Sequence, residues 1–170
     1  VVVPQILYAH ALNCFDMQDY VAASGFFGKL EADDLYSAQV DEFLFRKAYS
    51  ALENRRMDEA LAGFTELERR PVTDFSAPAR YALGYISYEN KDFREALEWF
   101  EKASTDSRFT EIANYYIMEC RFMLKDYKYV VTKGDAMYAS VPDDRKPHLA
   151  RIISEACLVL GDADKARQYY

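Results

Sequence analysis

The sequence predicts an all-α fold in which antiparallel helix hairpins stack into an α-solenoid. Three observations lead to this prediction: amphipathic runs come in pairs, each pair encloses a short polar turn, and small residues recur about every 36 residues. The composition agrees with it, because 51% of the 170 residues are hydrophobic, 29% are charged, and only 6 Gly and 5 Pro occur. Such a balance is typical of a folded chain rather than a disordered one.

The clearest hairpin is predicted over residues 81–103, where two amphipathic runs are joined around residues 90–92. In this stretch Gly84 is followed after twelve residues by Ala96, and after four more by Phe100. Two helices that cross closely need small residues where their backbones approach, and a large side chain to fill the gap towards the next pair. We therefore expect Gly84 and Ala96 at the helix crossing and Phe100 in the gap.

The same spacing predicts four more hairpins. Two upstream copies match well and two downstream copies are altered: Ala11, Ala23, Phe27; Ala48, Ala60, Phe64; Met118, Val130, Gly134; and Ser154, Ala166, Tyr170. The first positions of successive copies lie 37, 36, 34 and 36 residues apart. We expect one domain over residues 1–170 with repeats at 4–35, 40–71, 77–106, 111–140 and 147–170, the last of them incomplete.

An aspartate recurs in the turns of these hairpins. It stands just before the second helix of four copies, as Asp19, Asp92, Asp126 and, in a weaker copy, Asp162. A carboxylate there can accept hydrogen bonds from unpaired backbone N–H groups at the helix start. Between the hairpins, prolines in the linkers 71–78 and 139–147 are expected to end one helix or begin the next.

At these residues the sequence resembles the tetratricopeptide repeat (TPR) family, whose unit is a 34-residue helix-turn-helix with this small, small, aromatic pattern. The resemblance covers essentially the whole chain and is weakest in the fourth copy, where Val130 and Gly134 replace the alanine and the aromatic residue. It implies a right-handed superhelix whose concave face is lined mainly by first helices. The chain begins without Met and stops within a helical pattern, so we expect a fragment of a larger, bacterial-type TPR protein.

Charge and residue types argue against several other functions. A net charge of −7 without a basic stripe argues against nucleic-acid binding, which needs clustered Lys and Arg. No apolar run approaches the ~20 residues of a membrane helix, so membrane insertion is not expected. Three distant cysteines fit neither a disulfide framework nor a zinc site.

The sequence also predicts no catalytic residues, no metal site and no cofactor. Only two histidines occur, and His10 and His148 are interpreted as packed or capping residues. The stretch 25–29 has two glycines and a lysine, but its spacing differs from a phosphate-binding loop and no Ser or Thr follows. The acidic pairs 33–34 and 143–144 fall in expected loops, where solvation gives no reason for the raised pKa of an acid catalyst.

Aromatic residues supply the candidate binding surface. The chain has 14 Tyr, 11 Phe and 1 Trp, and many lie three residues before or one residue after the small first-helix position. By resemblance to the family, these two offsets point into the concave groove. The candidates are Tyr8, Phe45, Tyr49, Tyr81, Tyr85 and Tyr115, with the polar residues Glu119 and Arg151 at the same offsets in the last two copies. The alternative interpretation is that the rings only fill space between helices.

The leading functional hypothesis is a non-catalytic scaffold that binds a protein or peptide through this groove. A second hypothesis is a structural spacer or self-association module, in which the C-terminal end around Leu158 and Leu160 contacts another copy. A third is a regulatory domain that binds a small molecule. Neither the partner nor the cellular compartment follows from the sequence.

Overall fold

The computed structural model describes residues 2–169, and within that range all regular structure is helical. The chain divides into two compact units, Val1–Ile86 and Ser87–Tyr170. None of the described helices is long and apolar enough to span a membrane. The α-helices are α1 (Val2–Asp16), α2 (Tyr20–Phe27), α3 (Val40–Glu53), α4 (Met57–Glu68), α5 (Ser76–Glu89), α6 (Phe93–Ala103), α7 (Thr110–Met123), α8 (Tyr127–Ser140), α9 (Lys146–Val159) and α10 (Ala163–Arg167).

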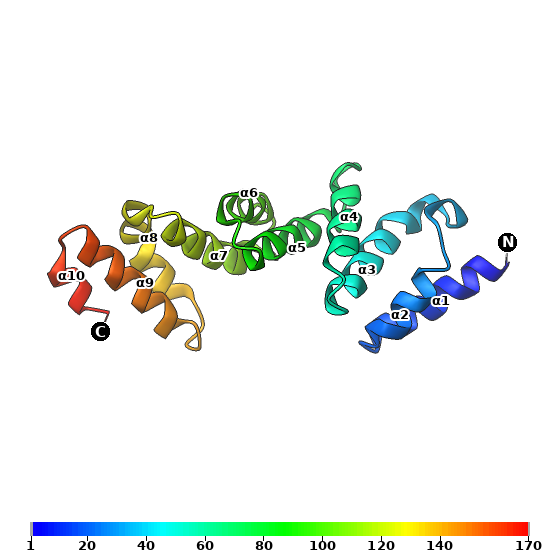
Figure 1. Ribbon diagram of the computed structural model, residues 1–170, viewed down its shortest axis with the longest axis horizontal. Helices are drawn as coiled ribbons and strands as arrows, with labels where there is room; N and C mark the ends of the chain where they lie inside the picture. The colour runs from blue at the N-terminus through cyan, green and yellow to red at the C-terminus, as the bar shows by residue number, and fades with distance from the viewer. Residues whose placement is uncertain (1, 170) are drawn as a thin grey trace. The chain divides into compact units, whose positions relative to one another are not determined.

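Unit 1 is built from two helix hairpins and the following helix (Figure 1). Helices α1 and α2 pack against each other, α3 packs against α4, and α2 contacts α3. The link between the hairpins contains two short 3-10 helices, Ala32–Asp34 and Ser37–Gln39. The core of unit 1 includes Tyr8, Phe27 and Phe43, which are at most 3% exposed.

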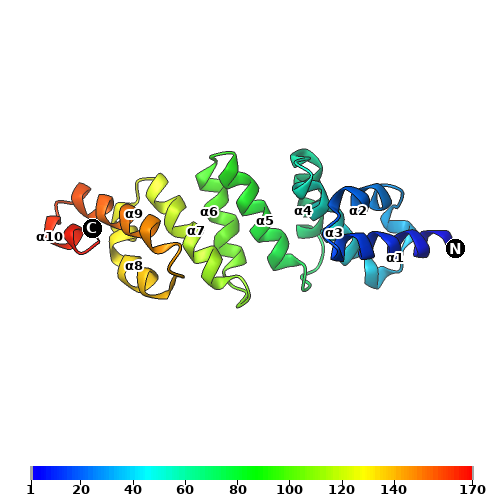
Figure 2. The same cartoon turned by 90° about the horizontal axis from the view of Figure 1, so that it is seen from below.

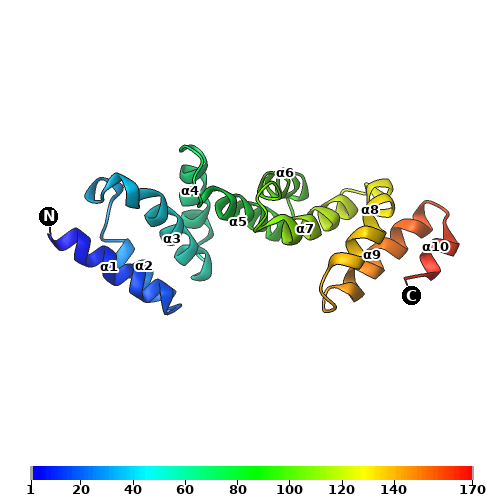
Figure 3. The same cartoon turned by 180° about the vertical axis from the view of Figure 1, so that it is seen from behind.

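Unit 2 continues the same alternation, with α6 against α7, α7 against α8, α8 against α9, and α9 against α10 (Figures 2 and 3). Pro147 occupies the first turn of α9, as expected for a proline that begins a helix. The core of this unit includes Met118, Leu149, Ile152 and Ile153, all at most 1% exposed. We number the helix pairs from α1/α2 to α9/α10 as repeats 1 to 5.

The turn aspartates cap the second helices, as the sequence predicts. Their side chains accept hydrogen bonds from backbone N–H groups three residues later: Asp19 from Ala22 at 3.0 Å, Asp92 from Glu95 at 3.2 Å, Asp126 from Tyr129 at 3.2 Å and Asp162 from Lys165 at 2.9 Å. In repeat 2 the same place is held by Arg56, whose side chain makes no cap hydrogen bond. The residue before each cap position has a left-handed φ of 60° to 83°, and among these five residues only Gly161 is a glycine.

The repeated triplets occupy the helix contacts predicted for them. The small residues Ala11, Ala23, Ala48, Ala60 and Ala96 are at most 2% exposed, and Phe27, Phe64 and Phe100 are completely buried. The aromatic rings contact rings of the next helix: Phe27 meets Phe43 at 5.9 Å between centroids, and Phe100 stacks on Tyr116 at 4.9 Å. Tyr170, the expected third member of repeat 5, lies outside the described residues.

Gly134 has a specific packing role in repeat 4. A Cβ atom at this position would lie 2.9 Å from Cγ1 and 3.0 Å from Cδ1 of Ile153. The space that a large ring fills in repeats 1 to 3 is thus taken up by a side chain from α9. The departure from the family pattern at this position is therefore compensated, because the small residue and Ile153 fit each other.

Replacing Gly134 with alanine is expected to destabilise unit 2 by about 1–3 kcal/mol, because the added methyl group displaces the completely buried Ile153. Urea denaturation followed by circular dichroism measures this change. Gly25→Ala is the matched control: Gly25 lies in α2 and its added Cβ would meet no atom within 4 Å. That change is expected to stabilise the chain by up to about 1 kcal/mol through helix propensity. Equal effects at the two positions would contradict the packing role of Gly134.

Candidate interaction surface

Phe45 and Tyr49 on α3 form the best-defined part of the predicted surface in unit 1. Their ring centroids lie 6.0 Å apart, and both side chains remain partly exposed. Tyr49 also contacts Phe15 and Tyr20, each at 5.7 Å between centroids with the rings tilted by 63°. Edge-to-face contacts of this kind are favourable for aromatic rings. They hold the Tyr49 ring in one orientation from several sides.

The Tyr49 hydroxyl is the polar end of this cluster. Two causes raise the pKa of Tyr49 to about 12: burial is the larger, and a hydrogen bond with Glu53 is the second. The phenol therefore stays neutral across the physiological range and keeps its O–H as a donor. A rigid ring with a neutral polar tip is a suitable contact for a protein partner.

Tyr8 occupies a different environment although it has the same offset as Phe45. It is only 3% exposed and lies in the core of unit 1, with its ring 6.4 Å from that of Phe43. Its hydroxyl donates a hydrogen bond to Glu42 at 3.3 Å, and burial together with Glu42 raises the pKa of Tyr8. Tyr8 connects α1 to α3 and presents almost no area to a partner.

The other two predicted residues of unit 1 lie on α5. Tyr81 and Tyr85 are four residues apart, so they share one face of the helix. Both side chains are partly exposed. They thus combine packing with accessible ring area, as Phe45 and Tyr49 do.

In unit 2, Glu119 is the centre of a buried hydrogen-bond network. Its side chain is 8% exposed; the carboxylate accepts a hydrogen bond from the hydroxyl of Tyr88 and lies 2.9 Å from Nε2 of His148. The Tyr115 hydroxyl donates a hydrogen bond to the same carboxylate. Burial is the larger cause that raises the pKa of Tyr115, and this hydrogen bond is the second. The sequence places Glu119 at a groove offset. In the structure its partners lie on α5, α7 and α9, so the residue connects these three helices.

Tyr115 and Arg151 are the accessible members of the predicted set in unit 2. Tyr115 is partly exposed, and the guanidinium of Arg145 lies 4.9 Å from its ring centroid. Arg151 is exposed, forms an ion pair with Glu155 at 2.7 Å, and lies 5.9 Å from the ring of Phe122. Arginine over an aromatic ring is a cation–π contact. The accessible groups here are therefore more polar than in unit 1.

A second aromatic pattern, absent from the sequence-based set, marks the turns. A ring near the end of the first helix meets a ring that begins the second helix five residues later. The pairs are Phe15–Tyr20 at 5.5 Å, Tyr88–Phe93 at 5.6 Å and Phe122–Tyr127 at 5.8 Å, with the rings tilted by 70° to 76°. The repeated spacing of the Asp-aromatic turn is the signal that could have revealed these pairs.

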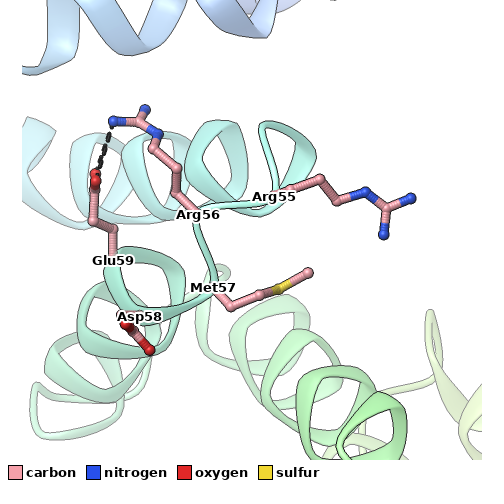
Figure 4. Close-up of a pocket in the computed structure, with 5 residues that line it drawn as sticks. All are labelled: Arg55, Arg56, Met57, Asp58 and Glu59. Atoms are coloured by element: carbon pink, nitrogen blue, oxygen red, sulfur yellow. Dashed lines mark hydrogen bonds and ion pairs between the residues drawn. The ribbon is translucent and has the colours of Figure 1, made fainter.

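The structure also contains a charged hollow at the α3–α4 turn, of about 380 Å³ and lined by residues 55–59 (Figure 4). Figure 4 shows Arg56 directed towards Glu59, with which it pairs at 3.0 Å, and Arg55 directed away from that pair. No nucleophile with an adjacent base lines this hollow. Within residues 2–169, no group of three His, Cys, Asp or Glu residues is placed to hold a metal ion.

Comparison with known proteins identifies the fold. No protein-family model matches the chain, and no curated protein matches it. The crystal structure of MamA protein, a TPR-containing protein, is similar with a TM-score of 0.76 over 98% of this chain and 87% of that chain, at 14% sequence identity. The chain therefore has a TPR-like α-solenoid fold. The fold by itself identifies no partner.

Proposed function

We propose that the chain is a non-catalytic scaffold that binds a protein or peptide through partly exposed aromatic side chains of its first helices. The observation that carries the proposal is the Tyr49 ring, which three neighbouring rings hold in place while part of it stays accessible. A ring fixed in this way loses little conformational freedom on binding. Such preorganised aromatic residues supply much of the binding energy at protein interfaces.

Phe45, Tyr81 and Tyr85 extend this surface within unit 1, since they combine partial exposure with the offsets predicted for the groove. Unit 2 contributes a separate, more polar contact through Tyr115 and Arg151. Tyr8 and Glu119 act by keeping the first helices in position. The partner is thus expected to present apolar side chains to unit 1 and polar groups to unit 2.

The proposal is tested with peptides selected from a random displayed library against the chain. We expect Tyr49→Ala and Tyr85→Ala each to weaken binding of the selected peptides by about tenfold or more, because each removes accessible ring area. Tyr36→Ala is the control, since Tyr36 is a 63% exposed tyrosine in the α2–α3 link. Fluorescence anisotropy gives the affinities, and thermal unfolding gives the stability of each variant. Unchanged affinity together with lower stability would show that these rings only fill space between helices.

Self-association is a second candidate function, supported by the apolar residues at the end of α9. Leu158, Val159 and Leu160 are 48%, 61% and 52% exposed, and they are consecutive in the sequence. Contiguous exposed apolar residues are a common feature of protein contact sites. Light scattering separates the two candidates: a mass that rises with concentration and falls with Leu160→Ser favours self-association.

A further inference from the structure

One side of α1 exposes apolar residues. Helix α1 packs against α2 and α3 within unit 1 (Figure 1). On another side of the helix, Val3 is 64% exposed, Ile6 is 49% exposed, Ala9 is exposed and Leu12 is partly exposed. Residues three positions apart are neighbours on a helix surface, so these four side chains form one apolar stripe. We call this stripe the head surface.

In later repeats, the preceding repeat covers the position of Ile6. The equivalent residues are Phe43 in repeat 2, Ala113 in repeat 4 and Leu149 in repeat 5, and each is at most 1% exposed. The Phe43 ring, for example, meets the Phe27 ring of α2 at 5.9 Å between centroids. The head surface is therefore the side of a first helix that receives another repeat.

A second position on α1 gives the same contrast. Asn13 is exposed, whereas the equivalent residues Ser50, Cys120 and Ala156 are completely buried. Two separate positions thus agree that α1 has the side used between repeats, and that this side is uncovered within residues 2–169.

The end of unit 2 carries the other half of a repeat interface. In repeat 1, Phe15 and Tyr20 both contact Tyr49 of α3, each at 5.7 Å between ring centroids. The equivalent residues of repeat 5 are Leu158 and Ala163, and both are exposed. Apolar residues therefore remain uncovered at the place where a repeat contacts the next one. The tail surface, as we call it, consists of Leu158, Val159 and Ala163.

We infer that copies of this chain associate head to tail, with the tail surface of one copy packed on the head surface of the next. The inference rests on self-association, the second candidate function above, and specifies which surfaces meet. The interface between consecutive repeats continues in this way from one copy to the next. By the repeat positions, Leu158 takes the place of Phe15, and Leu12 of the next copy takes the place of Tyr49.

A second contact favours another copy of the chain as the occupant. Within the chain, Asp16 of repeat 1 forms an ion pair with Arg46 of repeat 2. At the same two positions of the head-to-tail contact stand Val159 and Ala9, which are both apolar. Because both members of the pair change together, the contact leaves no unpaired charge at the interface. A partner that kept either charged residue would lack this match.

Two substitutions at positions of similar exposure test the inference. Ile6→Asp adds a charge to the head surface and Leu158→Asp adds one to the tail surface, at positions that are 49% and 48% exposed. In sedimentation velocity, the average mass of the original chain is expected to rise with concentration. Each variant alone is expected to associate at least tenfold more weakly, because an uncompensated carboxylate at an apolar contact is costly.

An equal mixture of the two variants gives the decisive measurement. The tail surface is intact in Ile6→Asp and the head surface is intact in Leu158→Asp, so the mixture is expected to form a dimer with the affinity of the original contact. Growth stops at the dimer because both remaining surfaces carry a substitution. An interface between two identical surfaces cannot give this result.

Leu61→Asp is the matched control, since Leu61 is a 41% exposed leucine of α4 that belongs to neither surface. This variant is expected to associate like the original chain, and thermal unfolding followed by circular dichroism verifies that all three variants are folded.

The possible failures are distinguishable. An original chain that stays monomeric would overturn the inference together with self-association. Loss of association in Leu158→Asp but not in Ile6→Asp, or a mixture that forms no dimer, would overturn the head-to-tail contact alone. Peptide binding through Tyr49 and Tyr85 is measured with other variants, and neither outcome affects it.

Discussion

Replacing Phe100 with alanine is expected to lower the free energy of unfolding of unit 2 by about 3–5 kcal/mol, the usual cost of removing a buried phenylalanine ring. Phe100 is completely buried at the end of α6, and its ring stacks on Tyr116 of α7 with centroids 4.9 Å apart and planes 11° apart. The substitution removes the stabilisation gained by burying the ring. It also removes a ring contact between repeat 3 and repeat 4. Urea denaturation followed by circular dichroism measures the loss.

Trp99→Ala is the matched control for this prediction. Trp99 is the preceding aromatic residue on α6, but it is partly exposed, and its indole N–H reaches only Glu95 at 3.4 Å. Its removal is therefore expected to cost clearly less than that of Phe100. If Phe100→Ala cost less than about 1 kcal/mol, or less than the control, the gap-filling role of the third triplet residue would be wrong.

Features that depend on residues close in sequence could be predicted from the sequence. The cap at Asp92 involves only residues 92–95, and the hairpin of residues 81–103 follows from amphipathic runs and one turn. Small residues at helix crossings were also predictable, because every repeat brings two helices close together. In repeat 2 these residues are Ala48 and Ala60, which are both buried. The resulting fold is confirmed by the helical architecture and by the similarity to MamA protein.

Contacts between distant side chains were not predictable in this way. Tyr8 and Phe45 share one offset in the repeat, yet Tyr8 is buried because Glu42 and Phe43 of α3 enclose it. The altered repeat 4 is compensated by Ile153, a residue 19 positions after Gly134 that no repeat pattern links to it. Burial of a given position depends on which side chains the neighbouring helices supply, and spacing alone carries no such information.

The network around Glu119 is the clearest case. Its partners Tyr88, Tyr115 and His148 come from three different helices. From the sequence, Glu119 is expected at a groove offset and His148 is expected to be a packed or capping residue, and no pattern links the two residues. The polar character of Glu119 was therefore visible in the sequence, but its use inside unit 2 was not.

Replacing Glu119 with alanine is accordingly expected to destabilise unit 2 by about 2–4 kcal/mol. The change leaves the hydroxyls of Tyr88 and Tyr115 without their acceptor in a largely buried site, and it removes the partner of His148. Loss of a hydrogen-bond partner costs most when the remaining groups cannot reach water. Urea denaturation of the variant and of the original chain at pH 7 measures the difference.

Two further variants separate the network from a general effect of removing charge. Glu155→Ala removes a carboxylate whose side chain is 47% exposed and whose partner Arg151 is 51% exposed, so its cost is expected to stay below about 1 kcal/mol. Glu119→Gln keeps an oxygen acceptor of similar shape, and we expect it to retain part of the stability lost in Glu119→Ala. A Glu119→Ala variant as stable as Glu155→Ala would mean that the three partners find water, and the network would then have no part in joining α5, α7 and α9.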